Sequence, residues 1–392
     1  MSFPLFCPNP RCVFHHPLDT SSSRGSFAVV RIGSYQTKVA GPVQRYKCSS
    51  CGKTFSDRTF LLDYYTKKSL PYQDMQFALC SGQNLSSIAR FLHCSPASVQ
   101  NRFDRLCRNG ILFHQQCLHS LTLCEPLCAD GYERFDQSQY HPNNINILVG
   151  KNSQFMYAFS HTLLRRKGRM RPEQKLRRDL LDSRYKPPRG SATRAFSALL
   201  AEITTFWNPH TLPCLELYTD ENTLYPSALR RVPSLNTALC SRHLLHIQIP
   251  SSRPRTLHNP LFSCNYIDRE LTKDLSAYHR ESVCFVRNVC NGLSRLFCYL
   301  LYHNYCKEYR IRWGSTHYPV HAVLAGLPPS TFQPLLSQLY QTRLFFSHYT
   351  VSSLGTKLWC RGYPTPLKTK KEYLPKYAQI CDAQGQASLS SP

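Results

Sequence analysis

Four of the 19 cysteines in this 392-residue chain stand in two close pairs. Cys7 and Cys12 form the first pair, and Cys48 and Cys51 form the second. Zn²⁺ in structural sites takes four ligands at tetrahedral corners, and two close pairs of thiolates supply them at little cost in chain closure. Gly52 follows the second pair, where the turn of a zinc knuckle favours a residue that tolerates a positive φ. We therefore expect these four cysteines to hold a structural Zn²⁺ ion.

Histidines beside the first pair leave a second ligand set open. The first pair encloses four residues rather than two, and His15 and His16 follow it closely. A site with three cysteines and one histidine is therefore an alternative. The other cysteines are scattered through apolar segments and the total is odd, which does not indicate a disulfide framework. We expect most of them to be reduced and to serve as small core residues.

Two acids stand where predicted strands end. Asp130 and Asp220 each mark a point at which the chain leaves a sheet. Carboxylates at strand ends can meet at one edge and hold divalent cations, because Mg²⁺ and Mn²⁺ take oxygen ligands. Two such ions about 3.5–4 Å apart can activate a water or a 3′-hydroxyl and stabilise the leaving oxygen of a phosphodiester. The pattern predicts a site for phosphodiester chemistry, which needs a third acid.

A helix predicted to begin near residue 265 offers that third acid. At about 100° per residue, Leu271 and Leu275 fall within about 80° of Asp268, so Asp268 lies on the apolar face that must pack on the sheet. Glu270 is rotated by about 200° from Asp268 and is expected on the solvent side, near Lys273. A lone acid on an apolar face is costly unless it has a partner or a metal. We favour Asp268 as the third metal ligand and keep Glu270 as the alternative.

The elements that must position these acids alternate along the chain. Strands are predicted at 121–130, 143–149, 154–160, 214–220 and 237–241, and helices at 192–207, at 225–231 and from about 265. Short connections between the first three strands suit antiparallel neighbours. The order predicts an α/β fold with a mixed sheet and helices on its faces. Two further strands, at 27–32 and 43–47, are predicted between the cysteine pairs.

Two helical patterns in residues 72–108, broken at Cys94 and Ser95, predict a helix-turn-helix. Ser95 is a plausible N-cap and Pro96 a plausible first helical residue. In a recognition helix, polar residues near the start reach base edges while arginines contact phosphates. The residues predicted on the outer, DNA-binding face are Ser98, Gln100, Asn101, Arg102, Arg105 and Arg108. An ordinary helical hairpin with a solvated face is the alternative.

The charge balance favours a polyanionic partner. Lys and Arg number 48 against 23 Asp and Glu, a formal net charge of +25. Eleven Lys or Arg and three acids fall within residues 165–190, which we interpret as a solvated loop or a phosphate-binding arm. The N-terminus lacks the features of a secretory signal, and no apolar run approaches the roughly 18–20 residues of a membrane span. We expect an intracellular protein.

These motifs together resemble bacterial insertion-sequence transposases of the DDE superfamily. The matching pieces are the ribbon Cys48-Ser-Ser-Cys51-Gly-Lys-Thr-Phe55, the helix-turn-helix, and then Ala129-Asp130-Gly131, Tyr218-Thr-Asp220-Glu221 and Asn265-Tyr-Ile-Asp268-Arg269. The resemblance covers roughly residues 5–312. It implies a ribonuclease-H-like catalytic domain, as in retroviral integrases, with Asp130, Asp220 and Asp268 binding two Mg²⁺ or Mn²⁺ ions. The third acid is Asp here, whereas many relatives have Glu.

The resemblance also implies an organisation and a function. The expected domains are a zinc ribbon at 1–65, a helix-turn-helix at 66–112, a catalytic domain at 120–312 and a C-terminal extension with a disordered tail at 313–392. Such an enzyme would bind the terminal inverted repeats of an insertion sequence, cut the DNA and join its ends to a target, as a homodimer or higher assembly in the bacterial nucleoid. The alternatives are a non-catalytic DNA-binding regulator and a nuclease without joining activity.

Overall fold

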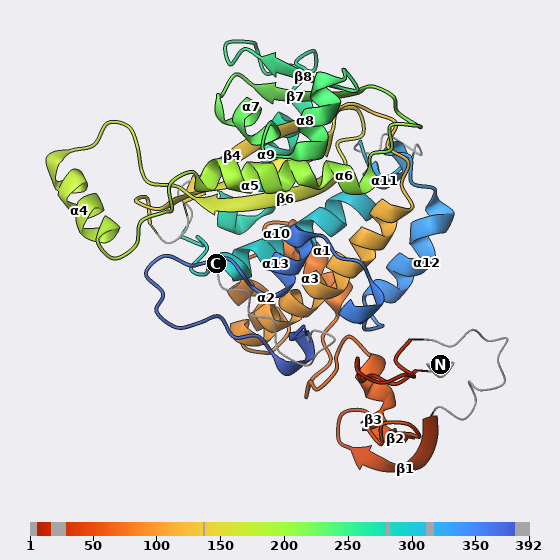
Figure 1. Ribbon diagram of the computed structural model, residues 1–392. Helices are drawn as coiled ribbons and strands as arrows, with labels where there is room; N and C mark the ends of the chain where they lie inside the picture. The colour runs from red at the N-terminus through yellow and green to blue at the C-terminus, as the bar shows by residue number, and fades with distance from the viewer. Residues whose placement is uncertain (1–5, 17–28, 136–137, 280–282, 311–316, 381–392) are drawn as a thin grey trace.

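The computed structural model describes residues 6–16, 29–135, 138–279, 283–310 and 317–380, and the expected disordered tail at 384–392 lies outside them. The described part is a mixed α/β structure with two sheets (Figure 1). The smaller, antiparallel sheet contains β1 (Val29–Thr37), β2 (Gly41–Cys48) and β3 (Thr54–Ser56). Both strands predicted between the cysteine pairs are therefore present, although residues 27–28 are outside the described ranges.

The larger sheet has five strands in the order β6-β5-β4-β7-β8. Their bounds are β4 (Leu127–Phe135), β5 (Pro142–Gly150), β6 (Met156–Leu163), β7 (Leu215–Asp220) and β8 (Leu244–Ile249). The first three strands are antiparallel neighbours, and β7 and β8 continue the sheet parallel to β4. The predicted α/β class with a mixed sheet is confirmed, because short hairpin connections join β4 to β6 and helical crossovers lead to β7 and β8.

Helices pack on this sheet and connect its parallel strands. They are α4 (Pro172–Asp182), α5 (Ser191–Ala201), α6 (Ile203–Phe206), α7 (Leu224–Leu229), α8 (Pro233–Cys240) and α9 (Phe262–Asp274). α5 packs against β5 and β6, and α9 packs against β4 and β5. α4 is the exception, since it projects from the body on its own arm (Figure 1).

A helical layer joins the two ends of the chain. It contains α1 (Tyr72–Cys80), α2 (Leu85–Phe91), α3 (Pro96–His119), α10 (Val289–Tyr305), α11 (His321–Leu324), α12 (Pro329–Leu339) and α13 (Ser353–Trp359). α3 crosses α10 so closely that a Cβ on Gly110 would lie 2.2 Å from Leu301 Cδ1. Farther along α3, His114 Nε2 lies 2.9 Å from the carbonyl oxygen of Tyr157 in β6. One continuous set of buried apolar residues therefore runs from Leu62 to Ala378.

Three predicted elements differ from those observed. Residues 237–240 belong to helix α8 rather than to a strand, and Ser241 caps that helix. Pro233 stands at its first turn, and the fifth strand, β8, follows it. The helix expected to begin near residue 265 begins at Phe262 and ends at Asp274. The first strand is shifted to Leu127–Phe135. In the described parts of the chain, no helix combines the length and apolarity needed to cross a membrane.

Candidate metal centre and acidic site

Cys7, Cys12, Cys48 and Cys51 converge beside the small sheet. Their sulfur atoms all lie within 4.8 Å of one another, and the pairs Cys7–Cys51 and Cys12–Cys48 are each 3.6 Å apart. Four sulfurs around Zn²⁺ at about 2.3 Å would be separated by about 3.8 Å. Three of the thiols are buried and Cys51 is exposed. The cluster could therefore hold a metal ion such as zinc.

Local hydrogen bonds shape the two knuckles. The Cys12 N–H donates to the Asn9 carbonyl, and the Gly52 N–H donates to the Cys48 carbonyl. Gly52 has a φ of +68°, the positive value expected for this turn. Burial opposes ionisation of Cys51, but hydrogen bonds from the Lys53 backbone and from Asn9 lower its pKa to about 6. A thiolate at this position suits metal ligation.

His15 is buried but is not part of this cluster. Its Nδ1 lies 2.7 Å from the Cys7 carbonyl oxygen, and its Nε2 contacts the Ser347 hydroxyl. Both ring nitrogens therefore face other partners, and His16 is exposed. The structure favours the four-cysteine ligand set over the alternative with one histidine.

The three predicted catalytic acids approach one another at the carboxyl-end edge of the large sheet. Asp130 lies within β4, Asp220 is the last residue of β7, and Asp268 projects from α9. Asp130 interacts electrostatically with both of the others. All three residues are partly accessible. Asp130 therefore lies near both of the other acids.

Burial and like charge make this arrangement costly without a cation. Burial raises the pKa of Asp130, although hydrogen bonds from the Gly131 N–H and the Tyr225 hydroxyl oppose the rise. Burial and the neighbouring charge of Asp130 raise the pKa of Asp268 to about 7. Among the described residues only the cysteines form a group with all ligand atoms within 4.8 Å. The three carboxylates are spaced more widely than the cysteine sulfur atoms.

Three residues near the acids have no counterpart in the sequence predictions. Tyr225 donates a hydrogen bond of 3.0 Å to Asp130 Oδ1. Arg134 donates to Thr272 on α9, and its charge, like that of Arg255, lowers the pKa of Asp268. Spacing alone could not find them, because Tyr225 follows Asp220 by five residues and the arginines are two among 48 Lys and Arg residues.

Glu270 does not occupy the expected solvent side of α9. It is 8 % exposed, and its carboxylate pairs with Lys273 and Lys307. These two ammonium groups outweigh the effect of burial and lower its pKa. The predicted exposure was wrong because Lys307, far away in sequence, approaches this face. With both oxygens in ion pairs, Glu270 is a poorer metal ligand than Asp268.

The predicted DNA-binding face of α3 is largely inside the protein. Gln100, Arg102, Arg105 and Arg108 are all less than 9 % exposed, and only Asn101 is exposed while Ser98 is half-buried. Arg102 Nη2 donates to the Lys68 carbonyl and Arg105 Nη1 to the Leu62 carbonyl. The predicted outer position was wrong for these four residues, because the segment 62–68 and the C-terminal part of the chain cover this face.

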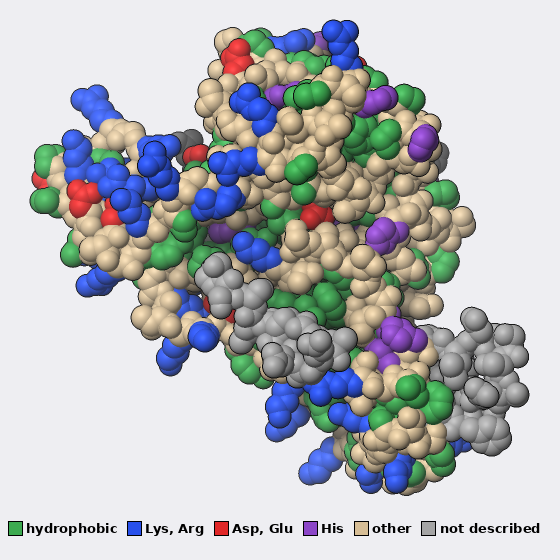
Figure 2. Space-filling model, viewed as in Figure 1, with side chains coloured by type: hydrophobic (Ala, Val, Ile, Leu, Met, Phe, Trp, Pro, Cys, Tyr) green, Lys and Arg blue, Asp and Glu red, His purple; other side chains and the backbone are tan. Residues whose placement is uncertain are grey.

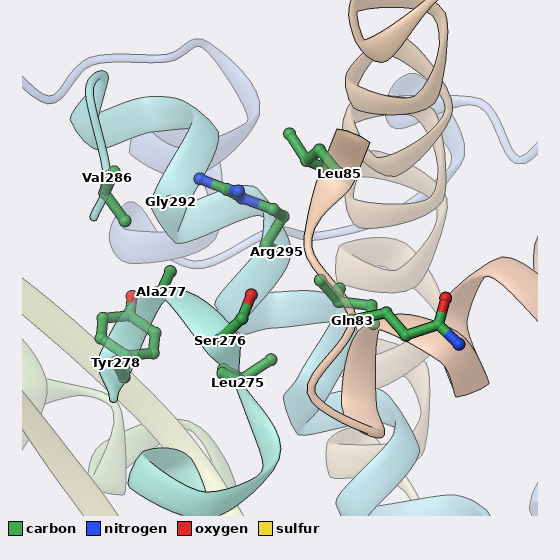
Figure 3. A pocket seen from close by; sticks show the side chains of 10 residues that line it. Gln83, Leu85, Leu275, Ser276, Ala277, Tyr278, Val286, Gly292 and Arg295 are labelled. Carbon is green, nitrogen blue, oxygen red and sulfur yellow. The ribbon is translucent and has the colours of Figure 1, made fainter. Parts of the chain in front are cut away.

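A separate shallow hollow lies between α10, the 3₁₀ turn η3 (Ser276–Tyr278) and the loop before α2 (Figure 3). Its lining residues are Leu79, Gln83, Leu85, Leu275, Ser276, Ala277, Tyr278, Val286, Gly292 and Arg295. The lining contains one charged side chain, Arg295, and no carboxylate. It therefore lacks the groups that acid–base or metal chemistry requires.

No protein-family model matches the chain, and a search of curated proteins finds no significant match. The protein can therefore be described only by its structure. It is a mixed α/β protein with a cysteine cluster that could hold a metal ion and a separate group of carboxylates at a sheet edge.

Proposed function

We propose that this protein is a DDE-type DNA transposase with a ribonuclease-H-like catalytic domain. The single observation that carries the proposal is the meeting of Asp130, Asp220 and Asp268 at one sheet edge. They come from the first and fourth strands of the large sheet and from the helix after the fifth. Three antiparallel strands followed by two strands parallel to the first is the order expected of a ribonuclease-H-like fold. The order of the strands and the positions of the three acids on them both support the proposal.

In this proposal the three aspartates hold two Mg²⁺ or Mn²⁺ ions. Bound there, the ions would supply charge stabilisation and an activated oxygen nucleophile for attack on a phosphodiester. Asp130 would face both ions, and Tyr225 would orient it through the hydrogen bond to Oδ1. Arg255, which is exposed near Asp130 and Asp268, would contact phosphate. Glu270 would have a structural role as a partner of Lys307.

We infer that recognition of the element's ends relies on the ribbon more than on the arginines of α3. The small sheet presents exposed cations: Arg31, Lys38, Arg45, Lys47 and Lys53. Figure 2 shows Lys and Arg side chains gathered over this lower part of the molecule. Within α3, Ser98 and Asn101 remain accessible for base contacts. Zinc held by the four cysteines would fix the ribbon fold.

The test is strand transfer with purified protein, Mg²⁺ and a duplex carrying the inverted repeats that flank the coding sequence. Asp130→Asn, Asp220→Asn and Asp268→Asn should each reduce cleavage and joining by at least about 10³-fold, because each removes a ligand charge. Asp74→Asn, at an exposed position of α1, is the matched control and should retain activity. Cleavage that survives in the Asp130 variant would refute the metal-site assignment. Binding of the ends without any cleavage would instead favour a DNA-binding regulator.

A further inference from the structure

Residues 164–190 form a basic arm between β6 and α5. The arm leaves the sheet after Leu163, carries α4 at its tip and returns at Ser191. It stands apart from the body on the left of Figure 1, and Lys and Arg side chains cover the same region in Figure 2. Eleven Lys or Arg residues and three acids lie in this segment. We refer to it as the α4 arm.

The acids of the α4 arm are largely neutralised within the arm itself. Arg165 pairs with both Asp182 and Asp179, and Arg178 also pairs with Asp179. The remaining acid is Glu173. Eight cations of the arm are exposed and form no ion pair among the described residues: Lys167, Arg169, Arg171, Lys175, Arg177, Arg184, Lys186 and Arg189. The arm therefore presents a strong net positive charge to the solvent.

The exposed cations of the α4 arm lie on and around a helix that is held in place by local interactions. Pro172 begins α4, where its missing N–H is harmless, and Gln174 Oε1 accepts a hydrogen bond from the Arg171 N–H. Leu181 is 7 % exposed. The ion pairs of Arg165 with Asp179 and Asp182 tie the start of the arm to its helix. A folded arm loses less conformational entropy on binding than a flexible loop would.

The arm starts at the same edge of the sheet as the acids. β4, β6 and β7 run in the same direction, so their carboxyl ends share one edge. Asp130 is in register with Ile147 of β5, and Ile147 is in register with Phe159 of β6. Leu163, at the base of the arm, is four residues farther, which is about 13 Å along the strand and about 10 Å across two strands. With about 3.4 Å per nucleotide along one strand of DNA, this offset corresponds to about five nucleotides.

We propose that the α4 arm binds the phosphate backbone of the DNA that flanks the phosphodiester being cut. This inference rests on the function proposed above. Eight exposed cations against one unpaired acid fit a polyanion, and their position fits duplex emerging from the acidic site. Leu176 and Leu180 are also exposed, at 72 % and 49 %, and they could instead meet another protein. The charge excess favours DNA as the partner.

The experiment compares two full-length variants that each lose three positive charges. Arg171→Gln/Lys175→Gln/Arg177→Gln alters exposed arm residues, whereas Lys370→Gln/Lys371→Gln/Lys376→Gln alters exposed residues of the C-terminal segment. Binding of a duplex of about 30 base pairs and arbitrary sequence is measured by fluorescence anisotropy at several KCl concentrations. The slope of log K against log [salt] should become shallower by about 1–3 in the arm variant and by less than half of that in the control.

Cleavage separates this inference from the proposed function. The arm variant should cut donor duplexes with long flanks at least about tenfold more slowly than wild type, and should match wild type on duplexes without flanking DNA. An unchanged salt slope, with cleavage still lost in Asp130→Asn, would overturn the arm assignment and leave the proposed function standing. Association that depends on Leu176 and Leu180, with DNA binding unaffected by the charge changes, would also overturn it. A changed slope without any divalent-dependent cleavage would overturn the proposed function instead.

Discussion

Two effects raise the pKa of Asp268: burial of its carboxyl group and the negative charge of a neighbouring carboxylate. Its carboxyl faces Asp130 across the junction of α9 and β4, and both effects raise its pKa to about 7. The opposing charges of Arg134 and Arg255 reduce the cost without removing it. A group held in this way gains most from a divalent cation, which replaces the repulsion between the carboxylates with attraction to a shared charge.

This cost should appear in the pH dependence of stability. Since the pKa of Asp268 is raised from an ordinary value near 3.8 to about 7, the folded protein keeps a proton that the unfolded chain loses. The contribution of Asp268 to stability is therefore complete below about pH 4 and declines as the pH rises towards 7. Asp268→Asn should abolish this decline and, without divalent cations, raise the free energy of unfolding at pH 8 by about 1–3 kcal/mol.

Chemical denaturation at pH 5 and pH 8, with and without Mg²⁺, measures the effect. The gain from Asp268→Asn should be larger at pH 8 than at pH 5, and added Mg²⁺ should stabilise the wild type but not the variant. Asp74→Asn, exposed on α1, is the control and should follow the wild-type profile. A variant that is less stable than wild type at pH 8 without Mg²⁺ would contradict the raised pKa.

At the scale of elements, α3 has a different role from the one that its pattern suggests. Amphipathic spacing and the Ser95 N-cap place the start of the helix correctly, and Ser95 accepts a hydrogen bond from the Ser98 N–H as expected. The helix nevertheless continues to His119, and its second half is buried on all sides. Arginines on its polar face bind carbonyls of neighbouring segments instead of facing solvent. α3 instead packs against residues 62–68, the C-terminal segment and β6 of the large sheet.

Arg102 is therefore expected to contribute to the stability of the fold rather than to contact DNA. Its Nε lies 3.2 Å from Asp63 Oδ1 and its side chain is 7 % exposed. Arg102→Ala would remove the positive charge next to the Asp63 carboxylate, which would keep only its hydrogen bonds from Ser69 and Tyr72, so we expect a loss of about 1–3 kcal/mol in the free energy of unfolding. Gln73→Ala, at an exposed position of α1, is the control and should change stability by less than about 0.5 kcal/mol. Denaturant unfolding of both variants provides the measurement, and equal stabilities would show that Arg102 is solvated in solution.

The sequence predicts elements where their signals are local. Hydrophobic alternation found β5, β6 and β7, and paired spacing found the four cysteines that the structure brings together. Asp220 was placed correctly at the end of a strand and Asp268 on the helix after the fifth strand, whereas Asp130, expected at a strand end, lies within β4 because that strand continues to Phe135. The predictions of side-chain exposure that were wrong concern residues covered by segments distant in sequence. Lys307 covers Glu270, and carbonyls of residues 62 and 68 cover the arginines of α3, and neither contact leaves a local signal.

At the scale of the whole molecule, the C-terminal segment completes the N-terminal part. The Arg343 N–H donates to the Phe60 carbonyl, and Leu61 forms a β-bridge with Thr342. The guanidinium of Arg343 also lies over the Phe345 ring, at 4.4 Å from its centroid. Residues 329–359 therefore pack on α3 and on the N-terminal residues next to the cysteine cluster. The first and last thirds of the chain fold as one unit around the central sheet.

Metal binding by the cysteine cluster should therefore affect the stability of residues more than 280 positions away in the sequence. The Cys7 carbonyl oxygen lies within hydrogen-bond distance of His15 Nδ1, and His15 Nε2 contacts the Ser347 hydroxyl. The ring centroids of Phe6 and Phe345 are 5.2 Å apart. Loss of a metal ion held by the four cysteines would release the Cys7–Cys12 turn that maintains these contacts. In hydrogen exchange monitored by mass spectrometry, a zinc-selective chelator should accelerate exchange of amides in residues 341–349 by at least about tenfold, while α5 keeps its protection.

The matched variants for this coupling are Cys48→Ser, within the cluster, and Cys214→Ser, at an exposed position outside it. Cys48→Ser should reproduce the effect of the chelator without any chelator present, because three thiolates bind zinc more weakly than four. Cys214→Ser should exchange like the wild type and respond to the chelator as the wild type does. Protection at 341–349 that survives both chelation and Cys48→Ser would show that the aromatic contacts alone hold the C-terminal segment on the ribbon, independently of any metal.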